Sequence, residues 1–174
     1  VQIVACGTSY HAGLVARHWI ESLTGLPCQV EVASEYRYRH AVVLPNTLMV
    51  GISQSGETAD TLAALEHVDA ENVLARLAIC NVDHSAMVRA CELVYLTQAG
   101  AEIGVASTKA FTTQLAALLM LTACLARHHA PNTLAQQDIE AALAELAVVA
   151  ERVLACDDKI KRLAQRFTTK HHAL

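Results

Sequence analysis

The stretch TLMVGISQSGETADTLAAL, residues 47–65, decides the fold because its pattern of apolar and polar residues changes twice. An apolar run of strand length at 47–53 ends in a small polar loop, and apolar residues at helical spacing follow within 57–68. The stretch therefore predicts a strand, a loop and a helix in that order. The loop has hydroxyl side chains and a glycine but no Lys or Arg, so a ligand held there would be held by neutral groups.

The same alternation continues along most of the chain. Strands are predicted at 1–6, 28–32, 47–53, 75–82 and 92–98, and helices at 11–24, 33–40, 57–68, 84–90 and 106–129. Strands that alternate with helices form parallel βαβ units, and strands that are apolar throughout are typical of a sheet covered on both faces. We therefore expect an α/β fold, a three-layer α/β/α sandwich around a five-stranded parallel sheet of the flavodoxin-like type, followed by C-terminal helices.

The segment after Pro131 has a different composition. Residues 133–153 and 157–170 are rich in Ala, more charged and helical in pattern. We expect a first domain at 1–130 and a helical extension at 131–174 that links it to a further domain. The sequence begins inside a strand-like run and without Met, so we expect a piece of a longer protein.

Composition excludes several classes of protein. The chain of 174 residues is 53% hydrophobic and 17% charged with a net charge of −4, so it has enough apolar material for a large core and no basic surface for nucleic acid. Its longest apolar run, 115–126, is too short to span a membrane and predicts a buried helix. Because this run is apolar on nearly every side, we expect the helices of 133–170 or a second copy to cover it, giving a homodimer.

The six cysteines indicate a reducing environment. None belongs to a CxxC motif, and most lie inside apolar runs, where a free thiol behaves as a small hydrophobic group. We therefore expect a cytoplasmic protein.

Three predicted strand ends combine glycine with hydroxyl residues ahead of a helix. They are residues 6–9 (CGTS), 53–58 (SQSGET) and 99–108 (AGAEIGVAST). The start of a helix offers free N–H donors and a positive dipole end, and Ser and Thr add further donors, so these turns suit an anion. The triphosphate motif GxxxxGK[ST] and the dinucleotide motif GxGxxG are both missing from the sequence. A phosphate monoester, which carries less charge, fits best.

Other interpretations of these turns remain open. Ser and Thr ahead of a helix also serve as simple N-caps. Glu57 is predicted to stabilise the first turn of its own helix, and Glu102 either to contact a ligand or to orient its loop. The pairs His128-His129 and His171-His172 do not have the spacing of metal ligands on a helix, so we expect no metal and no cofactor.

Several motifs resemble one family. CGTS at 6–9, SQSGETADT at 53–61 and AEIGVASTKAFTTQ at 101–114 are similar to sugar isomerase (SIS) domains. Together with EVASEYRYR at 31–39 and LAICNV at 77–82, they resemble the first isomerase half-domain of the glutamine-dependent glucosamine-6-phosphate synthases, or glutamine–fructose-6-phosphate aminotransferases. The resemblance covers nearly the whole chain.

The resemblance implies a ligand and the residues that bind it. The ligand is a hexose 6-phosphate, either fructose 6-phosphate or glucosamine 6-phosphate. The implied phosphate-binding residues are Ser9, Ser53, Gln54, Ser55 and Thr58, and the implied sugar-contacting residues are Thr8, Val105 and Ser107.

The resemblance also implies what this chain lacks. Whole enzymes of the family release ammonia in an N-terminal glutaminase domain, add it to the keto sugar and isomerise the product. Their base is a Glu in a second SIS half, within a stretch like EGALKLKE, and a ring-opening His comes from a KHG stretch of the neighbouring subunit. Neither stretch occurs here, so we expect no catalytic residue in this chain. It should bind hexose 6-phosphate without turnover, and the full-length protein should carry the glutaminase domain and the second SIS half.

Two other functions stay open. A stand-alone SIS phosphosugar sensor would carry an output module such as a helix-turn-helix, and a small isomerase would need its own base. The sequence suggests neither feature.

Overall fold

The computed structural model describes residues 1–68, 71–103, 107–129 and 134–171. The chain forms two compact units, Val1–Gln136 and Gln137–Leu174, and each is described by itself.

The first unit is built on a parallel sheet of five strands. They are β1 (Gln2–Ala5), β2 (Gln29–Val32), β3 (Thr47–Ser53), β4 (Val73–Cys80) and β5 (Leu93–Leu96), in the order β2-β1-β3-β4-β5. The helices of this unit are α1 (Gly7–Thr24), α2 (Ala33–Tyr36), α3 (Ala59–Glu66), α4 (Ala86–Ala90) and α5 (Lys109–His129). The strand order is that of flavodoxin-like folds, and the predicted fold class is confirmed.

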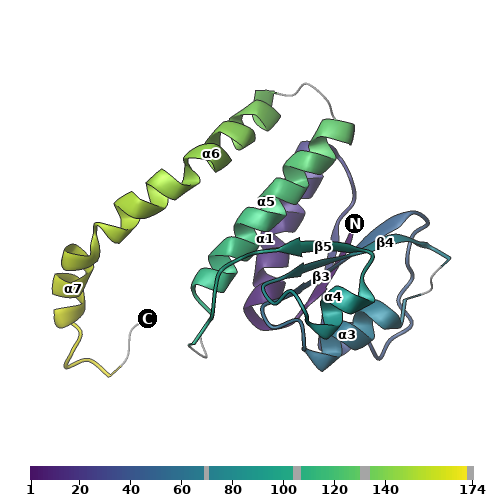
Figure 1. The fold of residues 1–174 in the computed structure, drawn as a ribbon, viewed down its shortest axis with the longest axis horizontal. Helices are drawn as coiled ribbons and strands as arrows, with labels where there is room; N and C mark the ends of the chain where they lie inside the picture. Colours follow the sequence, from purple (N-terminus) through teal and green to yellow (C-terminus); the bar gives the residue numbers. More distant parts are fainter. Residues whose placement is uncertain (69–70, 104–106, 130–133, 172–174) are drawn as a thin grey trace. The chain divides into compact units, whose positions relative to one another are not determined.

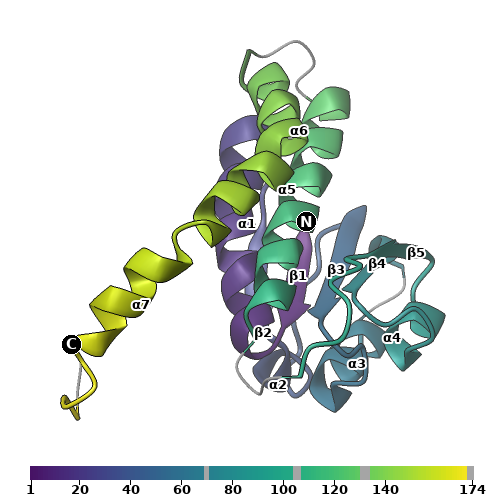
Figure 2. The same cartoon turned by 60° about the vertical axis from the view of Figure 1, so that its left-hand side comes forward.

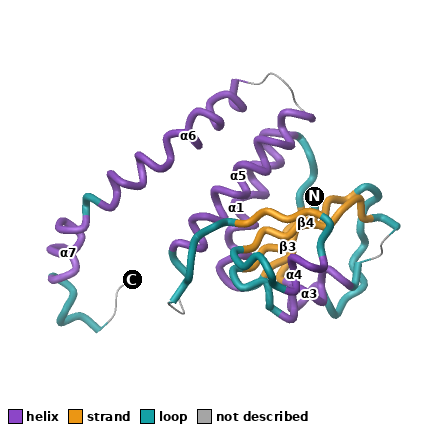
Figure 3. The backbone as a smooth tube through the Cα atoms, viewed as in Figure 1, coloured by secondary structure: helices purple, strands orange, loops and turns teal. Residues whose placement is uncertain are grey.

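Both faces of the sheet are covered by helices, which gives three layers (Figures 1 and 3). Alternate residues of a strand point to opposite faces, so Ile3 and Ile52 pack in the core beneath α1 and α5. Val4 and Met49 pack in the other core with α2, α3 and α4. All four side chains have no exposed surface, which is why these strands read as continuous apolar runs.

Helix α5 begins three residues later than predicted and contains the apolar run 115–126. Its 21 residues, Lys109–His129, are the one described stretch long and apolar enough to cross a membrane, a property that core helices of soluble proteins share. The helix lies beside α1 in Figures 1 and 2. Its residue Leu118 is fully buried in the core. The predicted burial is confirmed for the side of the helix that α1 and the sheet cover, whereas Met120 and Cys124 on another side are exposed.

Several helix boundaries differ from the sequence predictions by one to three residues, and the differences are larger at the start of α1, the end of α2 and the end of α7 (Asp157–Gln165), which ends at Gln165 instead of residue 170. Helix α1 begins at Gly7 instead of residue 11 because its first turn is small and polar and gives no periodic signal. Helix α2 ends at Tyr36 instead of residue 40. The residues that follow are held by ion pairs outside the helix: Arg37 binds Asp60 at 2.7 Å, and Arg39 binds Glu31.

The second unit is helical, as the sequence predicts. Helix α6 (Leu134–Leu154) enters it and α7 (Asp157–Gln165) follows. Both helices carry exposed apolar side chains, among them Val149 and Val153 on α6 and Ile160 and Leu163 on α7.

Candidate functional site

A hydroxyl-lined pocket lies at the carboxyl ends of β1 and β3. Its volume is about 430 Å³, and its lining consists of Cys6, Gly7, Thr8, Ser9, Ile52, Ser53, Gln54, Ser55, Thr58 and Ser107. The chain leaves β1 toward β2 on one side and then returns to β3 on the other, so this is the switch point of the sheet. Ligands of open parallel sheets bind at such a switch point.

Seven of the eight predicted binding residues line this one pocket. They come from two strand ends and from the segment ahead of α5, and parallel strands bring these segments to the same edge. The eighth, Val105, lies outside the described residues.

The loop 53–58 is held in shape by its own hydroxyl groups. The Ser53 Oγ atom accepts a hydrogen bond from the Gly56 amide at 3.0 Å and lies 3.2 Å from the Thr58 Oγ1 atom. The Ser55 Oγ atom accepts a hydrogen bond from the Glu57 amide at 3.2 Å. Ser53 is only 4% exposed, so this loop is preformed around the pocket.

Two helices begin at the pocket without a side-chain cap. The residue before α1 is Cys6 and the residue before α3 is Thr58, and neither makes a side-chain hydrogen bond to its helix. Thr8 and Ser9 lie inside the first turn of α1 rather than before it. Simple N-capping therefore does not account for these hydroxyl residues, and the first amides of both helices are not taken by a cap.

Ser107 contributes a hydroxyl group that lacks a partner. Its Oγ atom is buried, and it makes no hydrogen bond with the described part of the chain. A buried polar atom without a partner is unfavourable by about 1–3 kcal/mol. A ligand hydroxyl group in the pocket would supply the missing hydrogen bond.

The pocket suits an anion although its lining is uncharged. None of its ten lining residues is Lys, Arg, Asp, Glu or His. The attraction would come from the positive ends of α1 and α3 and from neutral hydroxyl and amide donors. Such a site fits a phosphate monoester better than a triphosphate, as the sequence predicts.

The two carboxylates of these turns, Glu57 and Glu102, accept hydrogen bonds from backbone amides of the protein. The Glu57 Oε1 atom accepts a hydrogen bond at 2.8 Å from the amide of Ala86, the first residue of α4. The prediction that Glu57 stabilises its own helix is therefore wrong. The loop lies against α4, where the Met87 amide donates to the Gly56 carbonyl oxygen at 3.0 Å.

Glu102 orients its loop, which is one of the two roles predicted for it. Its Oε2 atom accepts a hydrogen bond from the Ala110 amide at 3.0 Å, in the first turn of α5. In the described ranges, no three His, Cys, Asp or Glu side chains come together as a metal site requires.

Sequence reasoning missed some residues of the site. Ile52 lines the pocket, but as an apolar residue within a predicted strand it carries no recognisable chemical signal. Asn81 lies behind the pocket and contacts two of its loops. The sequence places it inside the strand predicted at 75–82, whereas β4 ends at Cys80, so the sequence pattern did not identify it.

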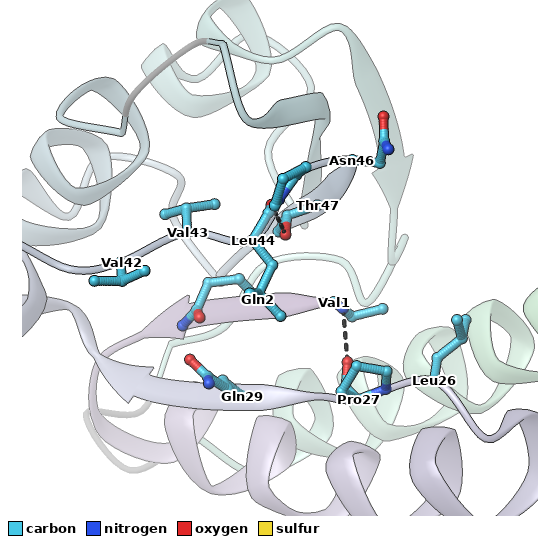
Figure 4. Close-up of a pocket in the computed structure, with 11 residues that line it drawn as sticks. Val1, Gln2, Leu26, Pro27, Gln29, Val42, Val43, Leu44, Asn46 and Thr47 are labelled. Atoms are coloured by element: carbon cyan, nitrogen blue, oxygen red, sulfur yellow. Dashed lines mark hydrogen bonds between the residues drawn. The ribbon is translucent and has the colours of Figure 1, made fainter.

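A smaller pocket lies at the other end of the strands (Figure 4). It measures about 190 Å³ and is lined by the amino ends of β1, β2 and β3 and the segment before β3. There the Thr47 Oγ1 atom donates to the Leu44 carbonyl oxygen at 2.7 Å, which closes the turn into β3. This pocket contains none of the predicted binding residues.

Comparison with known proteins agrees with this fold. The SIS domain family model matches residues 1–124, so the chain belongs to the SIS-domain family. It is 58% identical over its whole length to the glutamine–fructose-6-phosphate aminotransferase (isomerizing) of Legionella pneumophila, and 59% identical to the enzyme of the same name from Pseudomonas syringae. It spans only 28% and 29% of those two proteins.

A solved structure of a similar protein has the same fold. The chain aligns with the C-terminal domain of glucosamine-fructose-6-phosphate aminotransferase from Francisella tularensis with a TM-score of 0.90 and 46% identity. The alignment covers 98% of this chain and 48% of that one. The resemblance read from the sequence motifs is therefore confirmed, and the chain corresponds to a part of such proteins.

Proposed function

We propose that this chain is the hexose 6-phosphate-binding part of a glutamine–fructose-6-phosphate aminotransferase (isomerizing). The whole enzyme would make glucosamine 6-phosphate from fructose 6-phosphate and ammonia derived from glutamine. The observation that carries the proposal is an uncharged pocket at the switch point of the sheet that collects Ser9, Ser53, Ser55 and Thr58 at the starts of two helices.

The pocket divides into two parts in this proposal. The phosphate group is bound by Ser9 and by the loop with Ser53, Gln54, Ser55 and Thr58. The sugar chain is contacted by Thr8, Val105 and Ser107, and the Ser107 hydroxyl group, which has no partner among the described residues, supports that role.

The chain's contribution to the reaction is binding and orientation. Moving a proton between C1 and C2 of the sugar requires a positioned base. The lining of the described pocket includes no carboxylate and no imidazole. We therefore place the base in a second SIS half and the release of ammonia in a glutaminase domain, both in the full-length protein. We further propose that the chain acts in the cytoplasm and as a homodimer.

Binding measurements test the proposal. Calorimetry should show that the chain binds fructose 6-phosphate much more tightly than fructose. Ser55→Ala and Ser53→Ala should each weaken fructose 6-phosphate binding by roughly 1.5–3 kcal/mol, the value of a hydrogen bond to a charged group.

A matched control separates binding from folding. Ser22 lies on the exposed side of α1, where its Oγ atom donates to the His18 carbonyl oxygen at 2.6 Å. Ser22→Ala removes the same hydroxyl group away from the pocket and should leave affinity unchanged. Equal affinity for fructose and fructose 6-phosphate would contradict the proposed function.

A further inference from the structure

Asn81 connects two separate loops of the pocket. It directly follows β4, the strand between β3 and β5. Its backbone amide donates to the Gln54 carbonyl oxygen at 3.2 Å, within the phosphate loop 53–58. Its side chain faces the other way along the sheet edge, toward the loop after β5.

The side-chain amide of Asn81 is used as both a donor and an acceptor. The Nδ2 atom donates to the Gly100 carbonyl oxygen at 2.7 Å. The Oδ1 atom accepts from the Ala99 amide at 2.7 Å and from the Thr97 Oγ1 atom at 3.2 Å. A leucine of similar size would make none of these bonds, and an aspartate would keep only the accepting ones.

The loop held by Asn81 needs support. Gln98 has φ 51° and Gly100 has φ 70°, both in the left-handed region that is unfavourable for residues other than glycine. Further along, Glu102 binds the Ala110 amide at 3.0 Å, and Ser107 between these anchors lines the pocket. Asn81 therefore holds residues 97–100, and Glu102 binds the first turn of the helix that follows Ser107.

We infer that Asn81 is a positioning residue that holds the start of the β5–α5 loop, residues 97–100, against the phosphate loop. It does not line the pocket itself, so it acts through Gln54 on one side and through residues 97–100 on the other. The inference rests on the proposed function, because it assigns the phosphate to one loop and the sugar chain to the other. Loss of the side chain should then weaken recognition of the sugar more than recognition of phosphate.

Two probes separate the two loops. Inorganic phosphate reports on the phosphate loop, and fructose 6-phosphate reports on both. For Asn81→Leu we expect fructose 6-phosphate to bind about tenfold more weakly, whereas phosphate affinity stays within about twofold of the original value. Asn81→Asp should fall between Asn81→Leu and the unchanged chain because it keeps the accepting bonds.

Asn72 offers a matched control. It directly precedes β4, at the end of the strand away from the pocket, and its backbone carbonyl accepts a hydrogen bond from the Thr47 amide. Asn72→Leu makes the same change of side chain and should alter neither affinity.

The outcomes distinguish this inference from the proposed function. If the unchanged chain binds neither probe, the proposed function fails. If the unchanged chain binds both probes, two results overturn the inference. One is that Asn81→Leu binds fructose 6-phosphate as tightly as the unchanged chain does. The other is that Asn81→Leu loses as much affinity for phosphate as for fructose 6-phosphate. Hydrogen exchange tests the anchor without a ligand: residues 97–103 should exchange faster in Asn81→Leu, and unchanged exchange there would overturn the inference by itself.

Discussion

At the scale of the residue, Gly56 is the tightest point of the phosphate loop. Its φ of +67° is left-handed, and an added Cβ atom would lie 2.1 Å from the Ser85 Oγ atom and 2.7 Å from the Cys80 Sγ atom. Any side chain at this position therefore meets both backbone strain and a clash. Because Gly56 is bonded to α4 through its carbonyl oxygen, the clash would separate the loop from that helix.

Gly56→Ala should therefore lower the free energy of unfolding by about 2–4 kcal/mol, which combines strain and overpacking. Urea unfolding measures the change. Gly25→Ala is the control, because Gly25 has a similar φ of +69° but no atom within 4 Å of the added carbon. It should show the strain alone, and an equal loss for both variants would contradict the proposed clash.

The buried thiol group of Cys28 should resist alkylation. Burial raises its pKa to about 11, so the reactive thiolate is scarce at neutral pH. At pH 8 we expect iodoacetamide to label the half-buried Cys156 of the second unit well before Cys28, and labelling of Cys28 to rise as the pH approaches 11. Mass spectrometry of peptides measures both sites, and equal rates at pH 8 would show that Cys28 is not buried in solution.

The residues of the pocket could be predicted, but their local partners could not. Ser9, Ser53 and Ser107 were predictable because polar residues at successive strand ends meet at one edge of a parallel sheet. Glu57 and Asn81 were not, since their bonds to Ala86 and Gly100 depend on distances that only the folded loops define.

At the scale of the element, the bounds of a buried strand could be predicted from the sequence, whereas the start of a helix at the pocket could not. Strand β3 was predicted with its observed bounds, Thr47–Ser53, because both of its faces are buried and its residues form one apolar run. The start of α1 was missed because Gly7, Thr8 and Ser9 have no apolar periodicity. They belong to the pocket, so the sequence departs from a regular helical pattern where binding requires it.

The bond from Glu57 to α4 should contribute to stability. Glu57→Ala leaves the Ala86 amide without its partner at 2.8 Å and should lower the free energy of unfolding by about 1 kcal/mol, as for loss of an N-cap. Glu66 is an exposed carboxylate in the last turn of α3. Glu66→Ala is the control. A negative charge at the C-terminal end of a helix is unfavourable, so removing this carboxylate should not lower the free energy of unfolding. Equal losses in thermal unfolding would contradict the cap.

At the scale of the whole molecule, an apolar groove supports the proposed homodimer. The groove measures about 400 Å³ and lies between β5 and α5, with Leu93, Val94 and Met120 in its lining. These side chains are 42–48% exposed, and contiguous exposed apolar surface of this kind is typical of interaction sites. We expect a second copy of the chain to cover it. Sedimentation should show a concentration-dependent dimer, and a stable monomer with rapid hydrogen exchange along α5 would contradict it.

In the proposed full-length protein, this chain binds the substrate and another part supplies the catalytic base. This chain should bind fructose 6-phosphate and should not isomerise it. General base catalysis is typically worth a hundredfold to ten-thousandfold in rate, or about 3–5 kcal/mol of barrier. The carboxylates of the polar turns are already occupied, Glu57 by the Ala86 amide and Glu102 by the Ala110 amide.

Exchange of a carbon-bound proton tests this directly. When the purified chain is incubated with fructose 6-phosphate in deuterated water, we expect no deuterium at C1 above a control without protein. Calorimetry on the same preparation must show binding, so that an inactive fold is not mistaken for a missing base. Deuterium at C1 that Glu102→Gln abolishes would show that Glu102 leaves its helix and acts as a base, and the chain would then be an isomerase by itself.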